Sequence, residues 1–212
     1  MSENSLGLQA EKLAEKSVGL ERTAELLLLG KPVVIPTDTV YGLAIMVSTD
    51  ADTEVLFTIK SRPPEKSIPW LIGSKDDLLI YTRDLPEWAL ALVDKYWPGA
   101  LTLVCMASEL VPPQFVAEDG SLALRMPDHE LVLELLTLVG APLATTSANI
   151  SGQAAVNVAA ELDLRVLSQV AGVLLGNDEA AGSLSKEPLS STIVSCLGSE
   201  AVVLRQGAVV CD

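Results

Sequence analysis

The sequence predicts an α/β protein with a twisted mixed sheet and flanking helices. Short apolar or β-branched runs alternate with segments of helical periodicity along the chain. The last predicted strands come close together, which indicates a mixed sheet rather than a purely parallel one. With 212 residues, of which 49% are hydrophobic and 20% charged, the chain is expected to form one globular domain over residues 1–212.

In the first part of the chain, two segments are predicted to be helical and three to be strands. The helices cover 8–30, as one or two helices, and 50–59, and the strands cover 33–36, 43–47 and 68–72. Gly30 would end the first helical segment, and Asp50 or Asp52 is a candidate cap for the second. Pro63 and Pro64 prevent this second helix from continuing, so 61–67 is predicted to be a loop.

The second part continues the alternation. Helices are predicted over 76–81, 86–96, 129–139 and 158–170, and strands over 101–106, 121–126, 142–145, 173–175, 192–194 and 202–204. The segment Trp97-Pro98-Gly99 is a strong helix breaker after the second of these helices. Asp128 is a candidate N-cap and Gly140 a candidate stop for the third.

Charge and cysteine content restrict the class of function. The net charge is −14, from 28 acidic and 14 basic residues, so strong direct binding to RNA is not expected. Three widely spaced cysteines indicate neither a disulfide framework nor a zinc site. No apolar run approaches the roughly 18 residues of a membrane span, and no secretion signal is evident, so we expect a cytoplasmic protein.

The stretch 32–43, P-V-V-I-P-T-D-T-V-Y-G-L, combines a predicted buried strand with a polar turn. Thr37, Asp38 and Thr39 follow the strand directly, and Gly42 allows close approach of the backbone. Ligands bind at this end of the strands in open α/β sheets. An ordinary Asp/Thr turn after a strand is the alternative interpretation.

Basic residues are few, so their clustering is informative. Lys60, Arg62 and Lys66 fall in one short segment that suits an anionic ligand such as a polyphosphate. A solvated basic loop would have the same composition. Arg125 and Arg205 each end an apolar run and carry charge to the rim of the sheet, although a surface arginine is equally compatible with each position.

The segment Ser147-Ala148-Asn149 places a hydroxyl and an amide at alternate positions of a small-residue turn, where backbone N–H groups can bind phosphate. Such a triplet also occurs by chance in loops. The glycine patterns of P-loop and Rossmann proteins are absent. His129 is the only histidine, which argues against a Ser-His-Asp triad or a histidine metal site.

Seven segments, taken in order, resemble the YrdC-like threonylcarbamoyl-AMP synthase family from about residue 22 to the end. They are P-T-D-T-V-Y-G-L (36–43), K-S-R-P (60–63), W-P-G-A-L-T-L-V (97–104), R-M-P-D-H (125–129), S-A-N-I-S-G (147–152), S-T-I-V (191–194) and L-R-Q-G (204–207). The length is similar to that of the single-domain type in this family. The resemblance implies a sheet around a deep, open and positively lined cavity.

The implied activity joins L-threonine, bicarbonate and ATP into threonylcarbamoyl-AMP and releases pyrophosphate, with Mg²⁺ as the expected cofactor on the ATP phosphates. The product would supply a separate tRNA-modifying transferase complex that makes the t6A nucleoside. Positioning and charge neutralisation suffice for this chemistry, because the carbamate of threonine itself attacks the α-phosphate. No covalent enzyme nucleophile is needed.

The resemblance also implies roles for individual residues. The residues expected at ATP are Lys60, Arg62, Lys66, Ser121, Ser147, Asn149, Ala155 and Arg205. Those expected at threonine are Thr39, Arg125, Thr145 and Ser191. The catalytic set is expected to be Lys60, Arg62, Ser147 and Asn149. No residue is expected to bind a metal directly, and Val40 and Leu143 are candidates to receive the methyl group of threonine.

This sequence departs from the family pattern in three places. The segment 67–71, S-I-P-W-L, lacks the histidine of the usual N-P-L-I-V-H, so that Leu71 stands in a position of altered contact. Ala155 and Val156 replace a Ser-Pro pair, and Ser195 replaces an aspartate. Two other functions remain open: an RNA-binding factor that uses the same cavity without catalysis, and a carbamoyl-transfer domain that acts with a partner.

Overall fold

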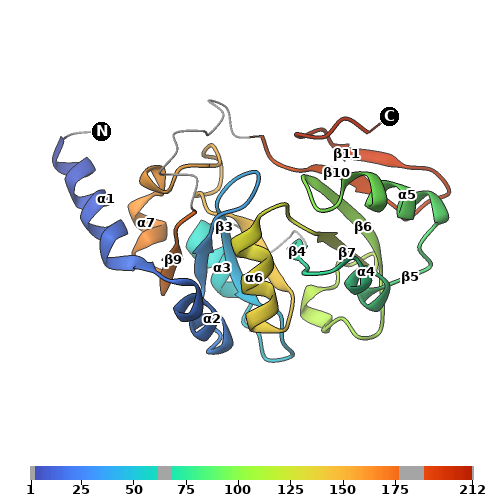
Figure 1. Ribbon diagram of the computed structural model, residues 1–212, viewed down its shortest axis with the longest axis horizontal. Coiled ribbons are helices and arrows are strands. Elements are labelled where there is room, and N and C mark those ends of the chain that lie inside the picture. Colours follow the sequence, from blue (N-terminus) through green and yellow to red (C-terminus); the bar gives the residue numbers. More distant parts are fainter. Residues whose placement is uncertain (1–2, 62–67, 177–188, 212) are drawn as a thin grey trace.

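The computed structural model describes residues 3–61, 68–176 and 189–211, with side chains from residue 6 onward. The strands of its sheet are β1 (Ser17–Val18), β2 (Val33–Ile35), β3 (Gly42–Met46), β4 (Trp70–Leu71), β5 (Thr82–Arg83), β6 (Leu101–Ala107), β7 (Ser121–Arg125), β8 (Leu143–Ser147), β9 (Gly172–Leu174), β10 (Thr192–Ser195) and β11 (Val202–Arg205). Helix α1 and the β10–β11 hairpin lie at opposite ends of the molecule (Figure 1).

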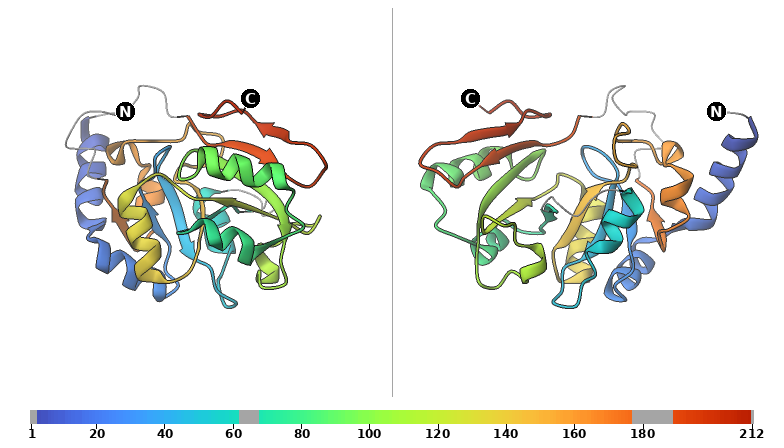
Figure 2. Two further views of the ribbon diagram at one scale, coloured as in Figure 1. Left: turned by 45° about the vertical axis from the view of Figure 1, so that its right-hand side comes forward. Right: turned by 180° about the vertical axis from the view of Figure 1, so that it is seen from behind.

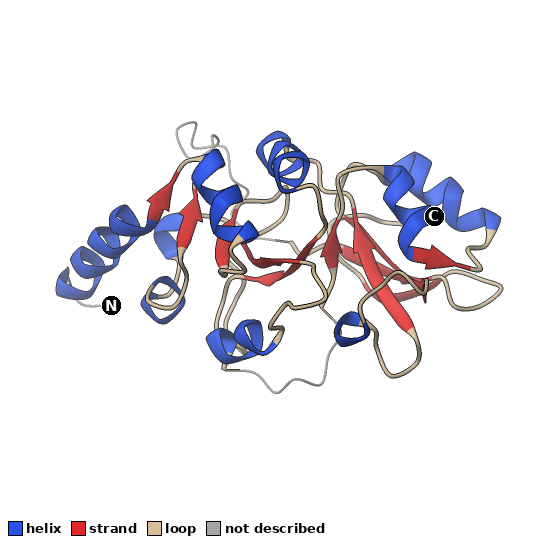
Figure 3. Ribbon diagram, turned by 90° about the horizontal axis from the view of Figure 1, so that it is seen from below, coloured by secondary structure: helices blue, strands red, loops and turns tan. Residues whose placement is uncertain are grey.

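The helices are short and surround the sheet. They are α1 (Glu3–Lys16), α2 (Leu20–Leu28), α3 (Glu54–Lys60), α4 (Lys75–Tyr81), α5 (Glu87–Tyr96), α6 (Glu130–Val139) and α7 (Leu164–Leu167), with single 3₁₀ turns at Pro113–Phe115 and Ala159–Glu161. Seen from below, helices lie on both sides of the strands (Figure 3). In the described part of the chain, no helix combines the length and apolar character that a bilayer span requires.

The predicted mixed sheet is confirmed. Ten strands follow one another in the order β1-β9-β2-β3-β8-β4-β7-β6-β10-β11, and β5 pairs with β6 beside this path. The pairs β9–β2, β4–β7 and β6–β10 are parallel, whereas β2–β3, β3–β8 and β6–β7 are antiparallel. In the back view, β6, β10 and β11 lie on one side of the centre of the molecule, and β2, β3 and β9 lie on the other side (Figure 2).

The two faces of the sheet bury different sets of side chains because consecutive strand residues point to opposite faces. On β7, Leu122 and Leu124 belong to the larger core, together with apolar residues of α3, α4 and α5. The other face packs against α2 and α6 through a smaller core that includes Leu71 and Leu143. Beyond the reach of these two helices, the same face carries Ser121 and Arg125 and is open to ligands.

Of the two expectations about helix starts, the one for α3 was partly right and the one for α6 was wrong. Helix α3 begins at Glu54, later than expected, and the Asp52 carboxylate accepts a hydrogen bond of 3.0 Å from the Glu54 N–H. Asp128 does not cap α6, because His129 occupies the N-cap position and makes no capping bond through its side chain. At the other end of α6, Gly140 adopts the left-handed conformation with φ 68° and ends the helix as predicted.

The prediction of a single helix over 158–170 is wrong. The chain forms a 3₁₀ turn, then an extended segment at Leu162 and Asp163, and then the four residues of α7. The side-chain amide of Gln9 on α1 donates to the carbonyl oxygens of Ala160 at 2.7 Å and Leu162 at 2.9 Å. These carbonyl groups therefore bond to another element, and Asp163 starts a new helical turn by accepting from the Arg165 N–H.

The cysteines lie in the core and near the end of the chain. Cys105 is buried on β6, Cys196 is buried directly after β10, Cys211 is partly exposed, and none of the three forms a disulfide within the described residues. A hydrogen bond to Cys196, together with burial, raises the pKa of the Cys105 thiol. Cys105 therefore stays protonated and acts as a small core residue.

Candidate functional site

An open cavity of about 970 Å³ lies on the polar face of the sheet. Its lining comes from strands that neighbour one another, from β3 through β8, β4, β7, β6 and β10 to β11. This volume is at the upper end of the range for ligand pockets in proteins, roughly 300 to 1,000 Å³. The cavity is therefore large enough for more than one small substrate.

Most of the residues predicted from the sequence line this cavity. They are Thr39, Lys60, Ser121, Arg125, Thr145, Ser147, Asn149, Ser191 and Arg205. Ala155 is not in the lining. Arg62 and Lys66 lie outside the described residues, so the positive lining of the cavity stays a prediction.

Strand periodicity explains how distant segments reach one surface. Ser121 and Ala123 face the cavity from β7, Thr102 and Val104 from β6, and Ile193 from β10. The residues between them point into the larger core on the opposite face. On β7 the core-facing positions are apolar leucines and the cavity-facing positions are small or polar, which leaves an open space above the sheet there.

The turn after β2 is organised by one hydroxyl. Thr37 Oγ1 accepts from the N–H groups of Thr39 and Val40, each at 3.2 Å, and donates to the Val40 carbonyl oxygen at 2.6 Å. A hydroxyl has a single proton, so the contact of 3.0 Å between the hydroxyls of Thr37 and Thr39 must be donated by Thr39. The Thr39 hydroxyl oxygen can therefore only accept a hydrogen bond from a ligand.

Arg125, at the end of β7, connects this turn to the rest of the cavity. Its guanidinium donates to Thr39 Oγ1 at 2.9 Å and to the Gly99 carbonyl oxygen at 2.9 Å, and it forms an ion pair with Asp38. The side chains of Arg125 and Asp38 are only 7% and 15% exposed. Three acceptors from two segments thus fix the plane of the guanidinium before any ligand binds.

The Trp97-Pro98-Gly99 segment supplies one of these acceptors. A side chain at Gly99 would bring its Cβ within 2.5 Å of the Tyr96 carbonyl oxygen, so only glycine fits there. The Gly99 N–H donates to the Met126 carbonyl oxygen at 2.9 Å, which ties this loop to the segment just after Arg125. The sequence marked this segment as a breaker and gave no sign of its contact with Arg125.

Part of the cavity lining is apolar. Gly42 pairs with Ser147 across β3 and β8, and a Cβ at Gly42 would lie 2.6 Å from the methyl carbon of Thr145. Val40 lines the cavity as expected, but Leu143 lies in the smaller core and not in the lining. Leu71 faces the cavity beside Arg125 and supplies apolar surface there instead.

Lys60 and the 147–149 turn form a second compact group. Lys60 Nζ donates to the Asn149 carbonyl oxygen at 2.8 Å and to the Ser147 hydroxyl at 3.2 Å, and it also bonds the Ser147 carbonyl oxygen. The Lys60 carbonyl oxygen accepts from the Ser151 N–H at 2.9 Å. The end of α3 is thereby joined to the turn after β8 through both backbone and side chain.

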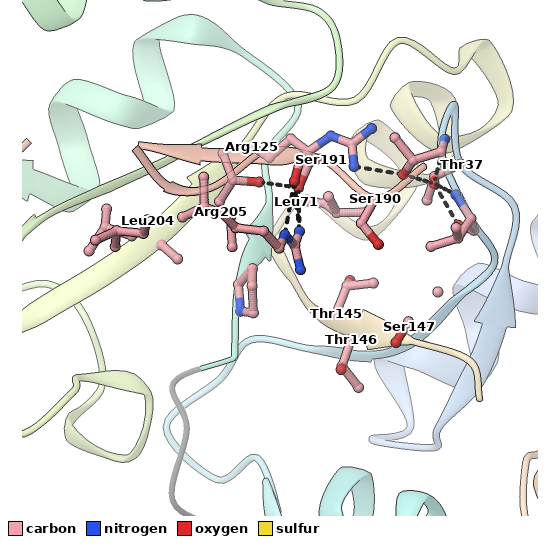
Figure 4. Close-up of a pocket in the computed structure, with 18 of the residues that line it drawn as sticks. Thr37, Leu71, Arg125, Thr145, Thr146, Ser147, Ser190, Ser191, Leu204 and Arg205 are labelled. Carbon is pink, nitrogen blue, oxygen red and sulfur yellow. Dashed lines mark hydrogen bonds between the residues drawn. The ribbon is translucent and has the colours of Figure 1, made fainter. Parts of the chain in front are cut away.

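Arg205 reaches the cavity from the exposed strand β11. Its guanidinium donates to the Ser191 carbonyl oxygen at 2.8 Å and to the Ser191 hydroxyl at 3.2 Å, and the Thr102 and Ser191 hydroxyls are 2.8 Å apart. Burial, and then the positive charge of Arg125, lower the pKa of Arg205. Figure 4 shows Arg125, Ser191 and Arg205 on one side of the cavity and Thr145, Thr146 and Ser147 on the other.

The acidic residues of the lining are Glu118 and Asp119, both exposed. Hydrogen bonds from Ser121 lower the pKa of Asp119, which keeps this residue a carboxylate. Across the described ranges 3–61, 68–176 and 189–211, no group of three or more His, Cys, Asp or Glu residues has the arrangement of a metal site.

Sequence reasoning missed three contributors to the site. Thr37 organises the turn, Gly99 accepts from Arg125, and Thr102 bonds Ser191. Thr37 and Gly99 lie inside segments that the sequence had already marked, so their types were visible but their partners were not. Thr102 gave no signal, because it lies within an apolar strand.

A family profile described as "Telomere recombination", for the Sua5, YciO and YrdC proteins, matches residues 25–207. Threonylcarbamoyl-AMP synthase of Pyrococcus abyssi is 33% identical over 178 residues, which are 84% of this chain and 51% of that protein. The enzyme of the same name from Bacillus subtilis is 32% identical over 204 residues, 94% of this chain and 56% of that protein. The chain thus spans about half the length of these two relatives.

Solved structures agree with this relationship. The structure of P. abyssi Sua5 complexed with L-threonine superimposes with a TM-score of 0.78 at 31% identity, covering 89% of this chain and 54% of that one. Escherichia coli YciO gives a TM-score of 0.78 at 22% identity over 89% of this chain and 88% of its own, which supports the fold alone. From the profile match and these relatives, we conclude that the chain belongs to the Sua5/YciO/YrdC family.

Proposed function

We propose that this protein is an L-threonylcarbamoyladenylate synthase. Its reaction would combine L-threonine, bicarbonate and ATP into threonylcarbamoyl-AMP and pyrophosphate. The observation that carries the proposal is one cavity, in a member of this family, that has a fixed guanidinium at one end and the Ser147 hydroxyl at the other. The amino acid and the nucleotide would occupy these two ends.

At the amino-acid end, Arg125 would bind the carboxylate of threonine. Its guanidinium is already held by Asp38, Thr39 and Gly99, so little conformational entropy is lost on binding. Thr39 presents an acceptor and thus suits the amine or the hydroxyl of the substrate. Leu71 and Val40 would contact its methyl group.

The covalent steps require little of the protein beyond placement. The amine of threonine and bicarbonate form a carbamate and release water. A carbamate oxygen then attacks the α-phosphorus of ATP, the bond to the bridging oxygen breaks, and pyrophosphate leaves with the bonding electron pair. Negative charge accumulates at the phosphates during this step, so cationic and hydroxyl groups that face them lower the barrier.

ATP would extend across the cavity, with its phosphates facing Ser147 on one side and Arg205 on the other. Ser121 of the lining and Arg62 and Lys66 of the basic segment would join them. Mg²⁺ would enter with ATP as part of the substrate, since it favours phosphate and water oxygens. The exposed carboxylates of Glu118 and Asp119 belong to the same donor class as these oxygens. The product would be used by a separate transferase complex that modifies tRNA.

A direct test measures pyrophosphate release from Mg²⁺ and ATP by the purified protein. We expect release only when threonine and bicarbonate are both present, with threonylcarbamoyl-AMP detected by mass spectrometry. Equal release without threonine would refute the proposed reaction. A tRNA gel-shift under the same conditions tests the RNA-binding alternative, for which the net charge of −14 is unfavourable.

A further inference from the structure

Lys60 is one of the few charged side chains in the interior, since the residue is only 4% exposed. It is the last residue of α3, where a positive charge interacts favourably with the helix dipole. A buried ammonium is costly unless hydrogen bonds replace its water. The partners of Nζ therefore indicate what this residue does.

Four oxygen atoms of the 147–149 turn surround Nζ. They are the carbonyl oxygen of Ser147, the carbonyl oxygen of Asn149 at 2.8 Å, Ser147 Oγ at 3.2 Å and Asn149 Oδ1 at 3.3 Å. An ammonium has only three protons to donate. These contacts direct the ammonium toward the turn, and moving Nζ to a phosphate would leave the buried carbonyl oxygens of Ser147 and Asn149 without this donor.

The same contacts give the two side chains of the turn different roles. Asn149 accepts from Lys60 and donates from Nδ2 to the carbonyl oxygens of Ile150 at 3.1 Å and Gln153 at 2.7 Å. Its amide is therefore used within the protein. Ser147 Oγ accepts from Lys60, so its single proton remains available for an acceptor in the cavity.

We propose that Lys60 is a positioning residue that acts on the ATP phosphates through Ser147. Its ammonium, braced by Asn149, fixes the 147–149 turn and directs the Ser147 hydroxyl proton toward a phosphate oxygen. This assignment rests on the proposed function and refines it, because Ser147 touches the phosphate while Lys60 and Asn149 hold Ser147 in place.

A double-mutant cycle on pyrophosphate release tests the assignment with Lys60→Met, Ser147→Ala and the double variant. Each single change should lower kcat/KM about 30-fold to 300-fold, mainly through kcat, as expected for loss of an oriented donor in the transition state. Because both changes remove the same interaction with the phosphate, kcat/KM of the double variant should be at most about 3-fold below that of the less active single variant. Multiplied losses would overturn the proposal and indicate an independent phosphate contact by Lys60.

Lys75→Met is the matched control, because Lys75 is a partly exposed lysine on α4 that pairs with the exposed Asp94. It should retain activity within about twofold of the unmodified protein. If the unmodified protein releases no pyrophosphate, the proposed function fails, and the proposal for Lys60 is then judged by a measurement that needs no catalysis.

That measurement is hydrogen exchange of the ligand-free protein. In Lys60→Met, amides of 147–153, including the Ser151 N–H, should exchange at least about 10-fold faster, because the turn loses its central donor. Amides of β2 and β6 should stay protected, which also shows that the variant is folded. Unchanged protection of 147–153 in a folded variant would overturn the positioning role. If Lys60→Met does not fold, Lys60→Gln takes its place in both experiments.

Discussion

Arg125 and Arg205 both lie at the ends of apolar strands that line the cavity, and their environments differ sharply. Arg125 is buried at 6% exposure and has Asp38, Thr39 and Gly99 as partners. Arg205 lies on a strand whose four residues are all exposed, and within the described residues no carboxylate forms an ion pair with it. In the part of the chain that the structure describes, its hydrogen bonds go to the carbonyl oxygen and the hydroxyl of Ser191.

The difference shows how one cavity can divide two tasks. The charge of Arg125 is balanced by Asp38 before a ligand binds. Arg125 therefore contributes oriented hydrogen-bond donors to a ligand rather than net positive charge. Arg205 keeps an unbalanced charge close to a second guanidinium, and an anion would relieve that repulsion. We therefore expect Arg125 to matter for stability and orientation, and Arg205 for the affinity of an anionic ligand.

The largest expected effect is that of Arg125→Ala. Removing one member of a buried pair leaves the Asp38 carboxylate without its partner, which typically costs about 3 to 5 kcal/mol in the free energy of unfolding. Urea denaturation measures the loss, and pyrophosphate release should fall as well. Arg125→Lys should recover little of either, because one ammonium cannot replace a planar donor that has three separate acceptors.

The matched control for this prediction is Arg165→Ala. Arg165 pairs with Asp163 at 2.6 Å within the short helix α7, and its side chain is 57% exposed. Its removal should leave the urea midpoint and the activity nearly unchanged, since exposed ion pairs contribute little. Equal destabilisation by the two alanine variants would contradict a special role for the buried pair.

The next effect in size concerns Arg205→Ala. We expect stability close to that of the unmodified protein and a loss in kcat/KM for ATP of about 30-fold to several hundred-fold, as for a charge-assisted contact to a ligand anion. The loss should shrink as salt is raised, because the site is exposed to solvent. A variant that is strongly destabilised and unchanged in ATP dependence would reverse the proposed division between the two arginines.

Discrimination between amino acids should be a smaller effect. One methyl group in an apolar pocket contributes about 1 to 3 kcal/mol, so threonine should be preferred over serine by roughly 10-fold to 200-fold. Valine should react more poorly than serine, because polar groups that meet the substrate hydroxyl would lose their partner. Values of kcat/KM for the three amino acids give the order. Valine reacting as well as serine would rule out recognition of the hydroxyl near Thr39.

Asp38→Asn tests the buried ion pair from its other member and should have a smaller effect than Arg125→Ala. The amide oxygen can still accept from Arg125, so the loss in unfolding free energy should be about 1 to 3 kcal/mol and below that of Arg125→Ala. Thermal and urea unfolding measure it. A loss larger than that of Arg125→Ala would mean that Asp38 has a structural role beyond holding this guanidinium.

Much of the fold could be predicted because its signals are local. The β-branched run at 33–35, the breaker at 97–99 and the helix stop at Gly140 act over a few residues, and each appears where it was expected. The alternation of small polar and apolar residues on β7 similarly assigns Ser121 and Arg125 to one face. These features depend on backbone sterics and strand periodicity, which the sequence contains directly.

The failed helix at 158–170 shows the limit of such signals. Its apolar spacing fits a helix, but Gln9, more than 150 residues away in the chain, bonds the carbonyl oxygens of Ala160 and Leu162. The contact between Gln9 and Leu162 joins residues 153 positions apart, so no pattern among neighbouring residues predicts it. The helix propensity of this segment is weak, and tertiary hydrogen bonds override it.

The features of the site also separate into those that the sequence predicts and those that depend on tertiary contacts. By itself, the sequence determined which residue types gather in short segments at the ends of strands and helices, and so it identified Thr39, Lys60, Arg125, Ser147 and Arg205 as candidates. Only the tertiary structure decided that Arg125 pairs with Asp38 and that Lys60 is directed into the 147–149 turn. Both contacts join segments more than 80 residues apart. They depend on strand order and register, which are set by the packing of the whole sheet and not by any local pattern.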